Sequence, residues 1–267
     1  YSWYHLYLQY FIYLLIIFFV VGSVFGSFYN VVAYRMSNNL SIIKPRSHCE
    51  WCNEKLKWYE LIPILSYLFQ GGKCNHCKHK LSIGYIIVEL VSGILFTICY
   101  YKFGLTPKLI ISLIFVSALV ITIVSDIEYM IIIDEVTLLA SIMILLVLLF
   151  TSGFQKAFYM LESGFFSFLT MYALKIIGDA IFKKETLGGG DIKLMFLFGI
   201  TLGYDMAIVS IFLGAFLAFP ISLYILLKRK DNMIPFGPFL SIGALLILIT
   251  KLDLAKILNW LQDTIIK

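Results

Sequence analysis

Long apolar runs dominate this chain, and short polar or glycine-containing segments separate them. The first run, residues 6–34, has 29 residues without Asp, Glu, Lys or Arg, which exceeds the roughly 20 residues that a helix needs to cross hydrocarbon. Because no basic segment precedes it, we expect a membrane span rather than a cleaved signal peptide. Gly22 and Gly26, four residues apart, predict close packing of this helix against another one.

Seven more apolar runs predict further membrane helices. They cover residues 81–101, 109–125, 136–155, 157–178, 194–204, 206–227 and 232–250. The run 194–204 has only eleven residues, about 17 Å of helix, so either this helix starts at Asp191 and thins the membrane, or it is not a full span. Residues 58–69 and 251–267 are expected to lie along the membrane surface. The predicted fold class is therefore all-α, a polytopic membrane protein with about eight transmembrane helices.

The composition agrees with a bilayer environment. Hydrophobic residues make up 61% of the chain and charged residues 14%, against about 25% charged in soluble domains. The net charge of +5 does not indicate direct nucleic-acid binding, because the basic residues flank apolar runs. With the amino terminus outside, the inner loops hold 14 Lys and Arg and the outer ones six. This asymmetry places Asp126, Asp191 and the loop after the first helix on the cytoplasmic side.

The chain divides by topology into a first transmembrane helix (1–34), a cysteine-rich cytoplasmic loop domain (35–83) and a transmembrane core (84–267). In the loop domain, 21 residues separate the pair Cys49 and Cys52 from the pair Cys74 and Cys77. Two C-x2-C pairs can supply four thiolates to one tetrahedral zinc ion. Disulfide bonds are the alternative, and a cytoplasmic location disfavours them. The fifth cysteine, Cys99, is expected to be an ordinary packed residue.

Two aspartates are candidate catalytic residues. Asp191 follows Gly188, Gly189 and Gly190 at the start of an apolar run, and Asp126 ends another run. Ionisable groups at such boundaries are costly and usually functional, although each aspartate could also simply cap a helix. Two carboxylates that share one proton can hydrolyse a peptide. Helix polarity predicts Asp191, at a helix N-terminus, as the base and Asp126, near a helix C-terminus, as the acid.

Four other residues are candidates for supporting roles. Gly188 and Gly190 allow a close approach of backbone and substrate. Lys193 either orients Asp191 or extends toward the membrane surface. Glu89, inside the run 81–101, either binds a basic part of a substrate or pairs with a nearby lysine. A phosphate-binding loop is a weak alternative for the glycines, because GxxxxGK[ST] is absent.

Five segments together resemble one family, the type IV prepilin peptidases, which are GxGD-type aspartic proteases of the bacterial inner or cytoplasmic membrane. The segments are residues 26–35 (GSFYNVVAYR), the paired C-x2-C loop with 60–66 (ELIPILS), 125–134 (SDIEYMIIID), 188–194 (GGGDIKL) and 235–239 (PFGPF). The resemblance implies catalytic roles for Asp126 and Asp191. Ile133 departs from the family, which usually has proline there.

The resemblance implies cleavage of short basic leaders from prepilins or pseudopilins on the cytoplasmic face. It also implies, for members with the cysteine loop, methylation of the new amino terminus with S-adenosylmethionine. A competence-type peptidase that serves DNA uptake fits the same motifs. Two alternatives remain open at this point: a presenilin-like intramembrane protease, for which no paired C-x2-C loop is expected, and a zinc-bearing transporter without enzymatic activity.

Overall fold

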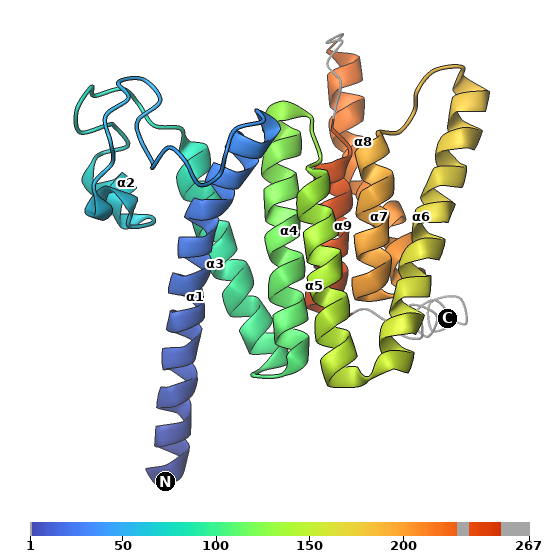
Figure 1. Cartoon of the computed structure of the whole chain (residues 1–267), viewed down its shortest axis with the longest axis horizontal. Helices are drawn as coiled ribbons and strands as arrows, with labels where there is room; N and C mark the ends of the chain where they lie inside the picture. Colours follow the sequence, from blue (N-terminus) through green and yellow to red (C-terminus); the bar gives the residue numbers. More distant parts are fainter. Residues whose placement is uncertain (1, 229–234, 252–267) are drawn as a thin grey trace. The chain divides into compact units, whose positions relative to one another are not determined.

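The structure is a computed structural model that describes residues 2–228 and 235–251 (Figure 1). Within these residues the chain is helical, and its extended segments form only two isolated β-bridges. This confirms the predicted all-α class. The predicted surface helix at the carboxyl end falls on residues 252–267, outside the described part of the chain.

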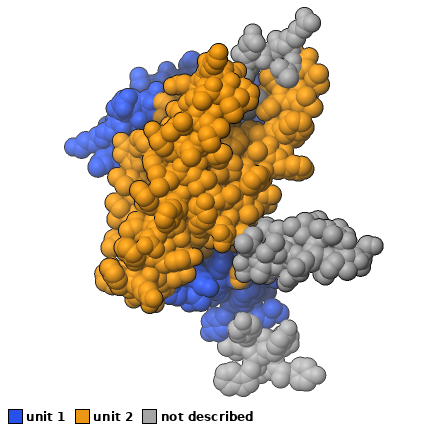
Figure 2. Space-filling view, turned by 90° about the vertical axis from the view of Figure 1, so that its right-hand side faces the viewer, with its two compact units in different colours: residues 1–109 blue, residues 110–267 orange. Residues whose placement is uncertain are grey.

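Contacts divide the chain into two compact units, Tyr1–Leu109 and Ile110–Lys267, drawn in blue and orange in Figure 2. Unit 1 contains α1 (Ser2–Ser37), η1 (Trp58–Leu61), α2 (Leu65–Phe69) and α3 (Ile83–Phe103). Unit 2 contains most of α4 (Pro107–Tyr129), then α5 (Asp134–Ser152), α6 (Phe154–Phe182), α7 (Gly189–Leu202), α8 (Tyr204–Leu227) and α9 (Gly237–Thr250). The division predicted by membrane topology, at 34/35 and 83/84, stays a prediction.

In unit 1, α1 and α3 touch through small residues. A Cβ atom added at Gly22 would lie 2.6 Å from the carbonyl oxygen of Ser92, and one at Gly26 would lie 2.9 Å from the Cα of Glu89. Side chains larger than hydrogen would therefore separate the two helices. The close packing predicted from Gly22 and Gly26 is confirmed, and α3 is the partner helix.

In unit 2, the short helix α7 is the centre of the packing. It contacts α5, α6, α8 and α9, and the ring of Phe198 packs edge-on against Phe115 of α4 at 5.7 Å. Leu194, Met195 and Leu197 have no exposed surface. The helix α7 is 14 residues long, about 21 Å, which is shorter than a bilayer is thick. The surrounding helices explain how such a short helix is accommodated. Protein rather than lipid covers it.

Each of the eight predicted apolar segments contains a helix in its described part, and residues 232–234 of the last segment lie outside the described residues. Six of these helices, α1, α3, α4, α5, α6 and α8, are long and apolar enough to cross a membrane. The other two, α7 and α9, have 14 residues each. The structure therefore supports a multi-pass membrane protein with six or more spanning helices.

Candidate functional site

Two buried carboxylates lie close together in unit 2. Asp126 belongs to the last turn of α4, and Asp191 belongs to the first turn of α7. Each is only 6% exposed, and the negative charge of Asp126 acts on Asp191. The structure therefore brings together the two aspartates that the sequence singled out, although they are far apart along the chain.

The carboxylate of Asp126 lies at the beginning of α9. The backbone N–H of Gly237, the first residue of α9, donates a hydrogen bond to it. A Cβ atom at position 237 would lie 2.5 Å from Asp126 Oδ2, so only glycine permits this approach. The positive end of the α9 dipole thus acts on Asp126. Because Asp191 also lies at a helix N-terminus, helix polarity alone no longer separates the two roles, and their order stays a prediction.

Asp191 is held by the residue that directly precedes α7. The backbone N–H of Gly188, the N-cap of α7, donates a hydrogen bond to the Asp191 carboxylate. A carboxylate at the third helical position that accepts from the N-cap forms half of a capping box. Asp191 Oδ1 is buried and has no hydrogen-bond partner among the described residues. A buried acceptor without a partner is costly, so this oxygen is suited to hold a water molecule or a substrate group.

Ile132, in the connection between α4 and α5, packs against the glycines of both aspartates. A Cβ atom added at Gly190 would lie 2.6 Å from Ile132 Cβ, and one at Gly237 would lie 3.0 Å from Ile132 Cδ1. Sequence reasoning singled out Gly190 but missed Gly237 and Ile132. The segment 235–239, with its Pro-Phe-Gly-Pro sequence, was one of the segments that resemble the family. Its sequence alone does not show which distant residue Gly237 contacts.

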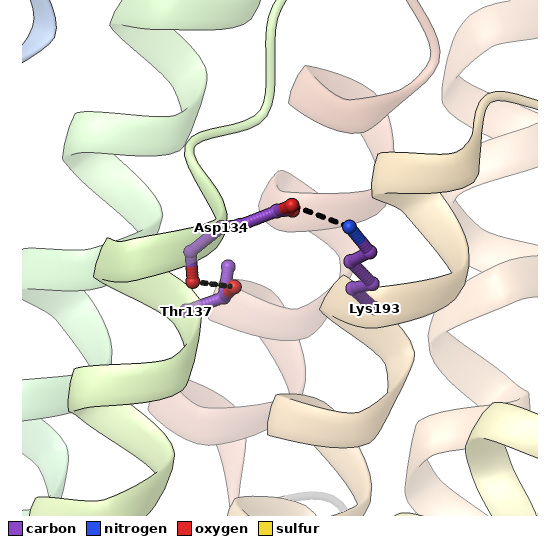
Figure 3. Close-up of polar contacts among 3 residues, drawn as sticks. All are labelled: Asp134, Thr137 and Lys193. Carbon is purple, nitrogen blue, oxygen red and sulfur yellow. Dashed lines mark hydrogen bonds and ion pairs between the residues drawn. The ribbon is translucent and has the colours of Figure 1, made fainter. Parts of the chain in front are cut away.

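Lys193 forms an ion pair with Asp134 at the start of α5 (Figure 3). Both side chains are about half exposed, at 51% and 54%, and no ion pair joins Lys193 to Asp191 within the described residues. Thr137 donates its hydroxyl to the Asp134 carbonyl oxygen at 2.9 Å. Lys193 therefore links α7 to α5. Ile133, which precedes this turn, has φ −78°, within the range that proline would impose.

The four cysteines of the C-x2-C pairs form one cluster in unit 1. Their Sγ atoms all lie within 4.8 Å of one another, and the Sγ atoms of Cys49 and Cys77 are 3.8 Å apart. A disulfide bond would require about 2.05 Å, and all four cysteines are free thiols. Four sulfurs bound to one zinc ion at about 2.3 Å lie about 3.8 Å apart. The cluster thus has the dimensions of a four-cysteine metal site.

The two halves of this cluster have the same backbone. In each half, the backbone N–H of the first cysteine donates to the carbonyl oxygen of the residue five positions later. The backbone N–H of the residue four positions later donates to the carbonyl oxygen of that cysteine. These hydrogen bonds are 2.8 to 3.0 Å long. Asn53 and Lys78 occupy equivalent positions with φ of 54° and 59°. Backbone N–H groups of Cys77 and His76 bond to Cys74 and lower its pKa to about 6. This favours the thiolate, the form that binds metal.

Glu89 of α3 is a buried carboxylate that supports the loop domain. It is 7% exposed, and its Oε2 accepts the backbone N–H of Ile64 at 2.7 Å. Ile64 has φ 63°, which is a strained conformation for a β-branched residue. Among the described residues no lysine or arginine pairs with Glu89, so the ion pair considered from the sequence is not observed.

A cavity of about 620 Å³ lies in unit 1. Its lining includes the buried carboxylates Glu60 and Glu89, the cluster residues Cys49 and Cys74, and aromatic side chains that include Trp51, Tyr34, Tyr67 and Tyr85.

The charged side chains that line this cavity are three carboxylates, Glu50, Glu60 and Glu89, and two cations, Arg35 and Lys80. The backbone N–H of Lys57 and the amide of Asn75 donate to Glu60, both at 2.8 Å, and these bonds lower the pKa of Glu60. Arg35 also lines the cavity, but its guanidinium donates to three carbonyl oxygens of residues 41, 42 and 45. Arg35 thus holds the loop, and the three carboxylates outnumber Lys80, so the cavity favours a cationic ligand.

Two family models match the chain. Residues 20–103 match the Bacterial Peptidase A24 N-terminal domain, and residues 113–223 match the type IV leader peptidase family. A protein of Bacillus subtilis (strain 168), named prepilin leader peptidase/N-methyltransferase, is 34% identical over 244 residues, which cover 87% of this chain and 93% of the relative. This chain belongs to the type IV prepilin peptidase family. The resemblance seen in the sequence is confirmed.

Two other relatives with the same name show similar agreement. The one from Vibrio cholerae is 30% identical over 249 residues, 87% of this chain and 95% of its own length. The one from Myxococcus xanthus is 36% identical over 187 residues, 69% of this chain and 55% of its own length. None of the solved structures matches the chain significantly.

The two family matches fall on different units of this prepilin peptidase. The N-terminal match lies in unit 1 and includes the cysteine cluster and Glu89. The type IV leader peptidase match lies in unit 2 and includes Asp126 and Asp191. Gly237, which donates to Asp126, lies outside both matched ranges.

Proposed function

We propose that this chain is a membrane aspartic endopeptidase that removes the leader from type IV prepilins or pseudopilins. The observation that carries the proposal is the pair of buried carboxylates, Asp126 and Asp191, within the range matched by the type IV leader peptidase family. The names of the relatives supply the substrate class, a prepilin leader. The distribution of basic residues supports a cytoplasmic position of the pair.

Two carboxylates that share one proton can perform the hydrolysis without a covalent intermediate. The ionised carboxylate takes a proton from water, and the water oxygen forms a bond to the scissile carbonyl carbon. The protonated carboxylate donates to the carbonyl oxygen, and the C–N bond then breaks as a proton passes to the leaving amine. Asp191 Oδ1, which has no hydrogen-bond partner in the part of the chain that the structure describes, is a position for the water or the carbonyl oxygen.

The proposal is tested with purified protein in lipid vesicles and a synthetic prepilin that contains the leader junction. Mass spectrometry is expected to show one cut, at the end of the basic leader. A cut within the hydrophobic segment would instead support a presenilin-like protease. No product from correctly inserted protein would contradict peptidase activity and leave the transporter as the alternative.

Gly190→Ala is expected to lower the cleavage rate about 10²-fold. The new Cβ would lie 2.6 Å from Ile132 Cβ, so α7 or the 130–133 segment must move, and a displacement of about 1 Å in an active site has this scale of effect. Gly189→Ala is the matched control, because no heavy atom lies within 4 Å of its added Cβ. Initial rates measured side by side check the prediction, and equal rates for the two variants would contradict it.

We further propose that Cys49, Cys52, Cys74 and Cys77 hold a zinc ion. Four thiolates leave no open coordination position, so such a site is structural rather than catalytic. The ion would join the two C-x2-C turns of a loop domain that has little apolar core of its own.

A second activity, methylation of the new amino terminus, is supported by the cavity of unit 1. Its volume of about 620 Å³ lies within the range of small-molecule sites. S-adenosylmethionine supplies a methyl group on a positively charged sulfur. The carboxylates of Glu60 and Glu89 can attract that charge, and the aromatic lining, with Tyr67 among it, can cover the adenine ring. These residues fit the donor in charge and in size.

Ser66→Phe is expected to weaken S-adenosylmethionine binding more than about tenfold, or about 1.4 kcal/mol. Ser66 of α2 lines the cavity, and a phenyl ring there would fill part of it. Leu68→Phe on the same helix is the control, because Leu68 is 62% exposed and does not line the cavity. Titration calorimetry of the donor with each variant checks the prediction. Wild-type affinity in Ser66→Phe would contradict this location.

A further inference from the structure

The connection between α6 and α7 is tied back to α6 by one carboxylate. Six residues, 183–188, join the two helices. Within them, the backbone N–H and the hydroxyl of Thr186 both donate to Asp179 Oδ1, at 2.7 and 2.9 Å. A Cβ atom at Gly178 would lie 2.6 Å from Thr186 Oγ1, so glycine at 178 permits this contact. Thr186 is thereby fixed on the last turns of α6.

This tie lies next to the hydrogen bond that holds Asp191. Only Leu187 separates Thr186 from Gly188, and the N–H of Gly188 donates to the Asp191 carboxylate. A short chain of contacts therefore runs from Asp179 through Thr186 and Gly188 to Asp191. Movement of Thr186 would move Gly188 with it, because the single intervening residue has little freedom to absorb a displacement.

The close backbone contacts between α6 and α7 lie further along α7. A Cβ atom at Gly164 would lie 3.0 Å from the carbonyl oxygen of Phe196, five residues after Asp191. The backbones of these helices meet where a Cβ atom at Gly199 would lie 2.5 Å from the carbonyl oxygen of Ser163. Gly199 is eight residues after Asp191, about 12 Å along the helix. These contacts hold α7 beyond its first turn, whereas the contact of Thr186 with Asp179 holds the connection that leads into that turn. It acts there beside the contact of Gly190 with Ile132 and the ion pair of Lys193 with Asp134.

We propose that Asp179 is a positioning residue for peptide cleavage, which acts by holding Thr186 and so fixing the carboxylate of Asp191. The inference rests on the proposed peptidase function and adds to it a residue that neither the motifs nor the relatives' names assign. Asp179 lies in α6 and accepts from the connecting loop. Its role therefore passes through Thr186 and not through the substrate.

Asparagine and alanine at position 179 distinguish this role from attraction of a basic leader. Asp179→Asn keeps an Oδ1 acceptor for Thr186 but removes the charge, whereas Asp179→Ala removes both. For a positioning residue, Asp179→Ala lowers kcat about 10- to 100-fold with an unchanged KM, and Asp179→Asn keeps most of the activity. An equal rise of KM in both variants would overturn the proposal in favour of leader binding.

Changes on the other side of the contact provide an independent check. Gly178→Ala leaves Asp179 intact but places a methyl group against Thr186, so the same loss of kcat is expected. Thr186→Ser retains both donors and is expected to retain activity. Glu185→Ala is the control within the connection, because Glu185 is exposed. The thermal midpoint of each detergent-solubilised variant is measured alongside, and a loss of kcat that follows a lowered midpoint would reduce Asp179 to a structural role.

The outcome also separates this inference from the proposed function. Wild-type kcat in Asp179→Ala, together with no cleavage by Asp191→Asn, would overturn only the positioning role. Cleavage by Asp191→Asn would overturn the peptidase assignment itself.

Discussion

Asp126→Asn and Asp191→Asn, tested one at a time, are each expected to reduce prepilin cleavage by about 10³-fold or more. An amide cannot take a proton from water, and it cannot deliver one to a carbonyl oxygen. Because the proposed reaction needs one carboxylate in each role, neither aspartate can replace the other. Both side chains are 6% exposed, and the substitution hardly changes their volume, so the loss is expected without a loss of folding. Product formation by mass spectrometry measures it.

Asp205→Asn is the matched control for these two variants. Asp205 lies in the first turn of α8 and is exposed, so the same chemical change there is expected to leave cleavage unchanged. Protease protection in vesicles shows whether each variant is inserted. Retained cleavage by either inserted active-site variant would count against the carboxylate pair.

Cys74→Ser is expected to remove the bound metal and to unfold the loop domain. Cys74 is 3% exposed, and its Sγ lies within 4.8 Å of the other three sulfurs. Structural zinc in small domains supplies about 10 to 16 kcal/mol of apparent binding free energy, so its loss exceeds what a loop of this size can replace. Since Cys49 and Cys74 also line the cavity of unit 1, binding of S-adenosylmethionine should be lost with the metal.

Elemental analysis and limited proteolysis check this prediction together. Wild-type protein should carry about one zinc ion per chain and should resist cutting between residues 47 and 82. Cys99→Ser is the matched control, because Cys99 lies in α3 outside the cluster, and it should keep the metal. Unchanged zinc content in Cys74→Ser, or disulfide-linked peptides from freshly isolated protein, would contradict the metal site.

The helices of this protein could be predicted from the sequence, because a long apolar run is a local property that the bilayer itself selects. Their ends were less accurate. The run 157–178 lies within the longer helix Phe154–Phe182, which begins directly after Gly153 with φ 86° and continues past the apolar run. The run 194–204 leaves out the first five residues of α7, which include Asp191 and Lys193. The alternative start at Asp191 lies two residues after the observed start at Gly189.

Parts of the site that depend on spacing or local chemistry were also predictable. The two C-x2-C pairs form one cluster, and Asp126 and Asp191 lie together. Contacts between distant segments were not predictable from one sequence. Nothing local indicates that Gly237 meets Asp126 or that Lys193 pairs with Asp134. Asp179 and Thr186 are closer together in the sequence than those pairs. Their contact still depends on where α6 ends, and the hydrophobicity of the sequence does not indicate that position.

The distance between positions 126 and 191 in membrane-inserted protein tests the carboxylate pair most directly. In a Cys99→Ala background, Asp126→Cys combined with Asp191→Cys should be joined within one chain by a short bifunctional thiol reagent. Asp126→Cys combined with Asp205→Cys should not, because Asp205 follows the opposite end of α7. Each single variant, treated with the same reagent, measures how much cross-linking involves the four native cysteines of the loop domain. No cross-link in the first pair, with both thiols shown to be reactive, would contradict a shared site.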